Sequence, residues 1–132
     1  MKNYLILLLT IVTFISCNND DDNYHFEYVP TVGVELEAEF NYERYNRVTV
    51  TYELPESCYS YYYYDYIYDG TSRVIAPIAI VNEDVTCEET PREGRFSFDI
   101  LATQSEPYIL KFWQGVDIDE NPIYLIIEVP VI

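Results

Sequence analysis

The sequence has few basic residues. Its 132 residues include 7 lysines and arginines against 23 aspartates and glutamates, a formal net charge of −16 at pH 7. Nucleic-acid binding needs a basic surface that displaces phosphate counterions, so this composition excludes that class. It also argues against electrostatic docking on an anionic membrane. The charge favours solubility through mutual repulsion, with a site for a cation or a basic partner as the alternative.

Histidine and glycine are also scarce. His25 is the only histidine, so any Ser-His-Asp or Cys-His arrangement would have to form next to the acidic N-terminal segment. Four glycines leave no glycine-rich phosphate loop. Carboxylates are so numerous that no pair stands out as a glycosidase pair. We therefore expect a protein without enzymatic activity and without a cofactor.

The one long apolar run is too short to span a bilayer. Residues 4–15 (YLILLLTIVTFI) follow Lys2 and would form about 18 Å of helix, against a hydrocarbon core of about 30 Å. This length is typical of the apolar region of a signal peptide. The run ends at Ser16 and Cys17.

Phe14, Ile15, Ser16 and Cys17 resemble a bacterial lipoprotein signal, with Phe14 in place of the usual aliphatic residue. The resemblance implies that residues 1–16 are removed and that Cys17 carries diacylglycerol on its sulfur and usually an acyl chain on its new amino group. Two or three chains anchor a protein stably. The product would carry six basic and 23 acidic residues, a net charge of −17.

Residues 17–23 form an acidic tether after the lipidated cysteine. The run NNDDDN is too charged and too poor in apolar residues to pack. It resembles the acidic run that sends Bacteroidota-type lipoproteins to the outer face of the outer membrane. A periplasm-facing lipoprotein and a plain solvated spacer are the alternatives. The only membrane contact we expect is the lipid anchor.

Residues 24–132 predict an all-β domain. Apolar and polar residues alternate over 34–40, 47–54 and 96–100, and apolar strands are predicted over 73–81, 108–113 and 123–131. Pro77 predicts an edge or interrupted strand. About seven short strands favour an immunoglobulin-like β-sandwich. The Cys…Trp…Cys hallmark of antibody domains is absent, since Trp113 follows both body cysteines.

Two cysteines, Cys58 and Cys87, remain in the body of the chain. An exported protein lies where disulfides persist, which favours a bridge between them. Metal binding is the competing use, although these two cysteines and His25 do not complete a four-ligand site.

The chain also resembles a group of small flavobacterial surface lipoproteins of uncharacterised function. The shared features are RVTVTY (47–52), Pro55 with Cys58, Cys87, PYILKFWQG (107–115) and YLIIEVPV (124–131). The likeness covers most of the domain. It implies a common β fold and a Cys58–Cys87 bridge, and it implies no activity.

The segment SCYSYYYYDYIYDG (57–70) is the candidate binding site. Strict alternation places Tyr59, Tyr61 and Tyr63 on one face of a strand and Tyr62, Tyr64, Tyr66 and Tyr68 on the other. Exposed tyrosines suit stacking on sugar rings or on a protein partner. An ordinary strand with aromatic cross-strand pairs is the alternative.

Asp117, Asp119 and Asn121 begin like a calcium loop, but Pro122 stands at the sixth position, where glycine makes the turn. An exposed acidic hairpin tip is therefore the default. The sequence as a whole predicts a lipid-anchored envelope protein with a non-catalytic accessory or protein-binding role. Glycan or substrate capture through the tyrosine-rich strand is the alternative function.

The anchor is tested by Cys17→Ala. Without the thiol that accepts the lipid, the chain should accumulate as an uncleaved, unlipidated precursor, as measured by metabolic labelling with a fatty acid and by mass. Normal lipid labelling of the variant would refute the assignment.

Overall fold

The computed structural model describes residues 23–132 of the chain, so Cys17 and the signal and tether predictions for residues 1–22 lie outside them. The described part contains eight strands and no helix, and therefore no helix that could cross a membrane. The prediction of an all-β fold is confirmed, with eight strands where about seven were expected. They are β1 (Tyr24–Tyr28), β2 (Thr31–Leu36), β3 (Tyr45–Leu54), β4 (Tyr59–Asp69), β5 (Ser72–Asn82), β6 (Arg92–Leu101), β7 (Tyr108–Val116) and β8 (Pro122–Val129).

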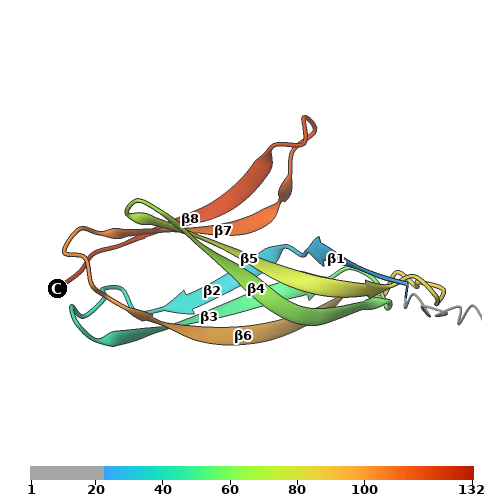
Figure 1. Ribbon diagram of the computed structural model, residues 1–132, viewed down its shortest axis with the longest axis horizontal. Helices are drawn as coiled ribbons and strands as arrows, with labels where there is room; N and C mark the ends of the chain where they lie inside the picture. Colours follow the sequence, from blue (N-terminus) through green and yellow to red (C-terminus); the bar gives the residue numbers. More distant parts are fainter. Residues whose placement is uncertain (1–22) are drawn as a thin grey trace, which may run out of the picture.

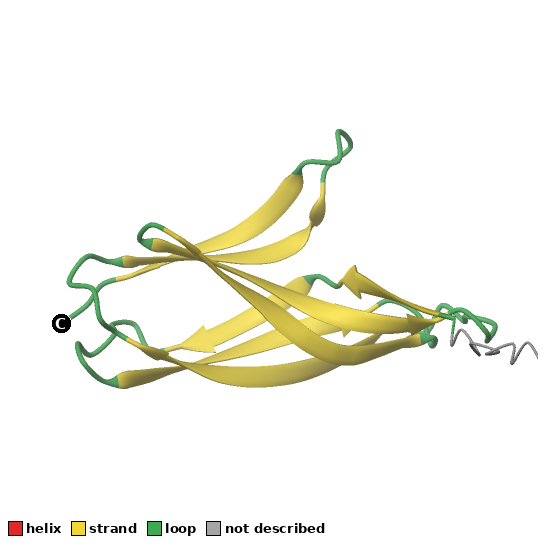
Figure 2. Ribbon diagram, in the orientation of Figure 1, coloured by secondary structure: helices red, strands yellow, loops and turns green. Residues whose placement is uncertain are grey.

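The strands form two sheets, consistent with a β-sandwich (Figures 1 and 2). The five-stranded sheet contains β1, β4, β5, β7 and β8, and the three-stranded sheet has the order β2-β3-β6. Strands β4 and β6 are edge strands of their respective sheets. The β7–β8 hairpin rises away from the other strands toward its tip (Figure 1).

Strand β5 lies in the middle of its sheet, so the prediction that Pro77 marks an edge or interrupted strand was wrong. On one side β5 pairs with β4 along its whole length. On the other side Ser72–Ile75 pairs in parallel with β7, and Ile78–Asn82 pairs with β1. Pro77 falls between these two partners. Proline lacks a backbone N–H, and here the ladder does not require one.

The core consists of the apolar residues that face each other across the sheets. Its main cluster includes the fully buried Phe40, Ile75 and Phe112. The predicted alternation over 34–40 holds only to Leu36, where β2 ends. Phe40 still enters the core, because it forms a separate bridge with Val131.

The disulfide Cys58–Cys87 is confirmed, with Cα atoms 5.1 Å apart. It fastens the exposed loop after β5 to the beginning of β4. Backbone hydrogen bonds support the same junction, since the Ser57 N–H donates to the Glu88 carbonyl and the Asn82 N–H to the Cys58 carbonyl. The bridge therefore fixes the start of the tyrosine-rich strand.

Replacing both bridge cysteines, Cys58→Ala with Cys87→Ala, should lower the free energy of unfolding by about 3.6 kcal/mol. This figure is the chain-entropy cost of a closed loop of about 30 residues. Urea unfolding of oxidised wild type and of the double variant measures it. An unchanged midpoint with an unchanged slope would show that the bridge contributes nothing.

Candidate functional site

A β-bulge divides the tyrosine-rich strand β4. Tyr61 lies opposite Ala79, but Tyr63 lies opposite Ile78, so Tyr62 is an extra residue in the ladder. One extra residue reverses the alternation of side chains from that point on. The predicted faces were therefore wrong. The bulge places Tyr59, Tyr61, Tyr64, Tyr66 and Tyr68 on the side that faces the other sheet, and Tyr63 on the outer side.

Rings on the inner side of β4 stack on the three-stranded sheet. The ring of Tyr61 lies 4.8 Å from that of Tyr52 on β3, nearly parallel to it. Tyr64 stacks on Phe96 and Phe98 of β6, with ring centroids 4.8 and 5.2 Å away. These contacts match the alternative reading of the run as structural. Tyr61 and Tyr64 are part of the packing between the sheets.

The outer side of β4 carries a second aromatic surface. Tyr62 and Tyr63 are 57% and 58% exposed, and Tyr62 packs against Phe26 of β1 at 4.7 Å. Tyr28 of β1 donates a hydrogen bond to the Asp65 carboxylate. Tyr63 connects this surface to the inner rings, since its ring stacks on that of Tyr64 with centroids 4.8 Å apart.

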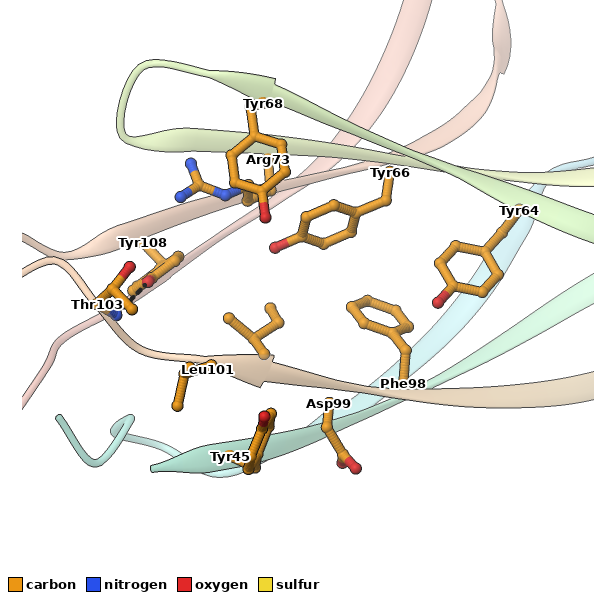
Figure 3. A pocket seen from close by; sticks show the side chains of 11 residues that line it. Tyr45, Tyr64, Tyr66, Tyr68, Arg73, Phe98, Asp99, Leu101, Thr103 and Tyr108 are labelled. Atoms are coloured by element: carbon orange, nitrogen blue, oxygen red, sulfur yellow. Dashed lines mark hydrogen bonds between the residues drawn. The ribbon is translucent and has the colours of Figure 1, made fainter. Parts of the chain in front are cut away.

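Toward the end of β4 the inner rings border an open cleft of about 420 Å³ between edge strands β4 and β6 (Figure 3). Tyr64 and Tyr66 project from β4 toward Phe98 of β6, and the ring of Tyr68 lies beside Arg73 (Figure 3). The volume lies within the range of small-molecule sites. The full lining is Tyr45, Tyr64, Tyr66, Tyr68, Arg73, Phe98, Asp99, Ile100, Leu101, Thr103 and Tyr108.

Arg73 is the buried cation of this cleft. It lies at the start of β5 and is 6% exposed. Its guanidinium lies 4.2 Å from the ring centroid of Tyr68 and 5.2 Å from that of Tyr108. The ring faces attract the charge and offset part of its lost hydration. The cleft therefore combines flat aromatic surfaces with one positive group.

Four tyrosines of the five-stranded sheet have pKa values raised to about 12. Burial raises the pKa of Tyr66 to about 12, although the nearby Arg73 charge opposes the rise. Burial likewise raises the pKa of Tyr61 to about 12. Hydrogen bonds to Asp65 and Glu27 are the main reason that the pKa values of Tyr28 and Tyr59 rise to about 12. All four hold their protons more tightly in the folded chain than in the unfolded one.

The other predicted site residues lie elsewhere. In the β7–β8 loop the Asp117 carboxylate accepts hydrogen bonds from the N–H groups of Asp119 and Asn121, 2.9 Å each, which closes the turn. His25 bonds to Glu83 at 2.6 Å and does not line the cleft. Among residues 23–132 the one cluster of metal-ligand side chains is Glu56 with Cys58 and Cys87, whose sulfurs form the disulfide.

Sequence reasoning missed Arg73, Phe98 and Tyr108 as members of the site. The sequence does contain a sign that Arg73 is buried. In an alternating strand Arg73 lies on the same face as Ile75, Ala79 and Val81, which all face the core. A single arginine on the apolar face of a predicted strand indicates a buried charge. Nothing local indicates that Phe98 would meet β4 or that Tyr108 would lie beside Arg73, because those contacts depend on how the strands and sheets pack.

Stability should fall as the pH rises from about 10 to about 12. Above the ordinary tyrosine pKa of about 10, the unfolded chain releases protons that the folded chain retains on Tyr28, Tyr59, Tyr61 and Tyr66. The stabilisation is complete below pH 10 and disappears through the folded pKa values. Phenolate absorbance should titrate later in the native protein than in denaturant. Coincident titrations would contradict the hydrogen bonds of Tyr28 and Tyr59 and the burial of Tyr61 and Tyr66.

Comparison with protein-family models, with curated proteins and with solved structures finds no match for this chain. The resemblance to lipoproteins therefore stays a prediction from the sequence. Any role of the cleft must therefore be argued from the residues that line it.

Proposed function

We propose that this protein is a non-catalytic binding module of the cell envelope that captures a sugar-containing ligand in the cleft between β4 and β6. The observation that carries this function is the set of tyrosine rings that border the cleft, which has a volume of about 420 Å³. Flat aromatic faces stack on the apolar faces of sugar rings. Hydroxyl groups at the ring edges supply hydrogen bonds.

The chemical groups around the cleft suit binding better than turnover. Its one carboxylate, Asp99, is held by Arg47 through two hydrogen bonds of 3.0 and 3.1 Å. Hydrogen bonding to Arg47 also lowers the pKa of Asp99, so this carboxylate is a poor general acid. Glycoside hydrolysis needs two carboxylates across the bond, and the cleft lining has one.

Lipid attachment at Cys17 would place such a module at the membrane surface. We propose the outer membrane, with the domain facing the cell exterior and a periplasm-facing arrangement as the alternative. The Cys58–Cys87 bridge supports an oxidising compartment. A short acidic tether would leave the folded domain close to the lipid while keeping its charged surface in water.

The second candidate function is the accessory or protein-binding role. It is favoured by the outer face of the five-stranded sheet, where aromatic side chains are exposed side by side. The aromatic residues are Tyr24, Phe26, Tyr28, Tyr62 and Tyr63, and the aliphatic Ile67 is also exposed there. Exposed aromatic side chains are typical of protein interfaces. Tyr62 lies on this face and outside the cleft lining, so substitutions of Tyr62 and of cleft residues can test the two functions independently.

Tyr68→Ser should weaken binding to a polysaccharide panel by at least about tenfold, because it removes a ring from the cleft. Tyr68 is 72% exposed, so its loss should leave the fold intact. Isothermal titration or glycan-array binding measures the effect, with thermal unfolding as the check on folding.

Tyr62→Ser is the matched control, since it removes the same ring from the outer side of the same strand. Glycan binding should survive this change. If Tyr62→Ser abolishes capture of an envelope protein while no glycan binds the wild type, the accessory function replaces the proposed one.

A further inference from the structure

The guanidinium of Arg73 has hydrogen-bonding capacity that the described residues 23–132 do not use. Nη1 donates to the carbonyls of Gly70 and Ser72, both at 2.9 Å, and Nη2 donates to Gln104 Oε1 at 3.3 Å. Nε is buried and has no hydrogen-bond partner, and the guanidinium lies close enough to the Tyr66 hydroxyl to oppose the rise in the pKa of Tyr66 that burial causes. A guanidinium has five N–H donors, so the N–H of Nε and one N–H of Nη2 remain. These two nitrogens share one edge of the guanidinium plane.

No carboxylate of residues 23–132 forms an ion pair with Arg73. The ion pairs in this part of the chain involve His25, Arg47 and Arg95. Asp99, the acidic residue in the cleft lining, forms an ion pair with Arg47. A buried charge ordinarily has a partner of opposite sign, because leaving water is costly. In a chain with 23 acidic residues, a buried and unpaired arginine in a cleft is a marked exception.

Resting on the proposed function, we infer that the cleft selects a sugar bearing a single carboxylate, such as a uronic acid, whose carboxylate pairs with the Nε edge of Arg73. A planar carboxylate accepts two parallel N–H bonds from that edge. The sugar ring lies against the tyrosines of β4. A phosphate can accept the same two bonds, but the strongly acidic chain disfavours its second negative charge.

The overall charge of the protein limits the ligand to few charges. A net charge of −16 repels polyanions at distances up to the Debye length, about 8 Å at physiological salt. One carboxylate held at Arg73 gains a direct pairing that salt screens little, because the group is buried. Affinity for an acidic monosaccharide should therefore hold or rise as salt is added.

Binding of methyl glucuronide, its uncharged methyl ester and methyl glucoside to the full chain tests the inference. The free acid should bind at least about tenfold more tightly than both neutral analogues, as expected for hydrogen bonds to a charged group. The ester changes the ligand alone, so this comparison does not depend on the folding of any variant. Benzoate identifies whether a carboxylate on a ring that is not a sugar suffices.

Arg73→Lys keeps the positive charge but removes the two parallel N–H donors of the guanidinium. The preference of the cleft for the free acid over the neutral analogues should therefore drop to less than about threefold. Arg95→Lys is the matched control, since Arg95 pairs with Glu35 on the three-stranded sheet and does not line the cleft. That variant should retain the preference.

Equal affinity for the acid and its neutral analogues would overturn the inference and leave glycan capture standing. Binding of benzoate, lost in Arg73→Lys, without binding of any sugar would uphold the carboxylate site and overturn sugar capture. If neither the sugars nor benzoate bind, both proposals fail.

Discussion

The packing of β4 tyrosines on Phe96 and Phe98 holds the edges of the two sheets together, and the site depends on it. Strands β4 and β6 belong to different sheets and share no backbone-to-backbone hydrogen bonds, so side chains join them, including Arg92 of β6, which donates to the Tyr59 carbonyl of β4. Tyr61 and Tyr64 stack on Phe96, and Tyr66 meets Phe98 edge-on at 5.6 Å. Aromatic pairs of this kind add about 0.5–1.5 kcal/mol each beyond the area they bury. These stacked rings fill the space between β4 and β6 along part of their length, and the cleft lies beyond them.

The bulge at Tyr62 makes that arrangement possible. Without an extra residue, Tyr64, Tyr66 and Tyr68 would point to solvent, and Tyr63, Asp65 and Ile67 would face the core. Burying Asp65 there would cost more free energy than burying a tyrosine ring gains. The carboxylate would leave water without its hydrogen bond from Tyr28. The shift in register thus explains how one strand can supply both packing rings and exposed aromatic side chains on its outer side. It also shows why so many consecutive tyrosines are tolerated, since rings on both sides of the strand have partners.

The sequence was sufficient for the class of fold and for the bridge, but not for the site. Alternation in residues 47–54 and 96–100 is a local property, and both segments form strands, β3 and β6, that pair with each other. A bulge is invisible to strict alternation, because a run of tyrosines looks the same on either side of it. The prediction for Pro77 was wrong for a related reason. Strand β5 can contain a proline because Pro77 falls in the gap between its partners β1 and β7, which are distant in the sequence. Arg73 was overlooked because its apolar neighbours identify the strand but not the cavity beside it.

Arg73 connects the stability of the cleft with the selectivity that we propose for it. Nη1 binds the carbonyls of Gly70 and Ser72, so the guanidinium fastens the β4–β5 turn while its ring contacts with Tyr68 and Tyr108 fix its plane. A guanidinium held on one side by backbone and on its faces by rings has little freedom left to lose when a ligand binds. Preorganisation of this kind lowers the entropic cost of association. The same rigidity prevents Arg73 from reaching the abundant surface carboxylates, which leaves its Nε edge unpaired in a strongly acidic protein.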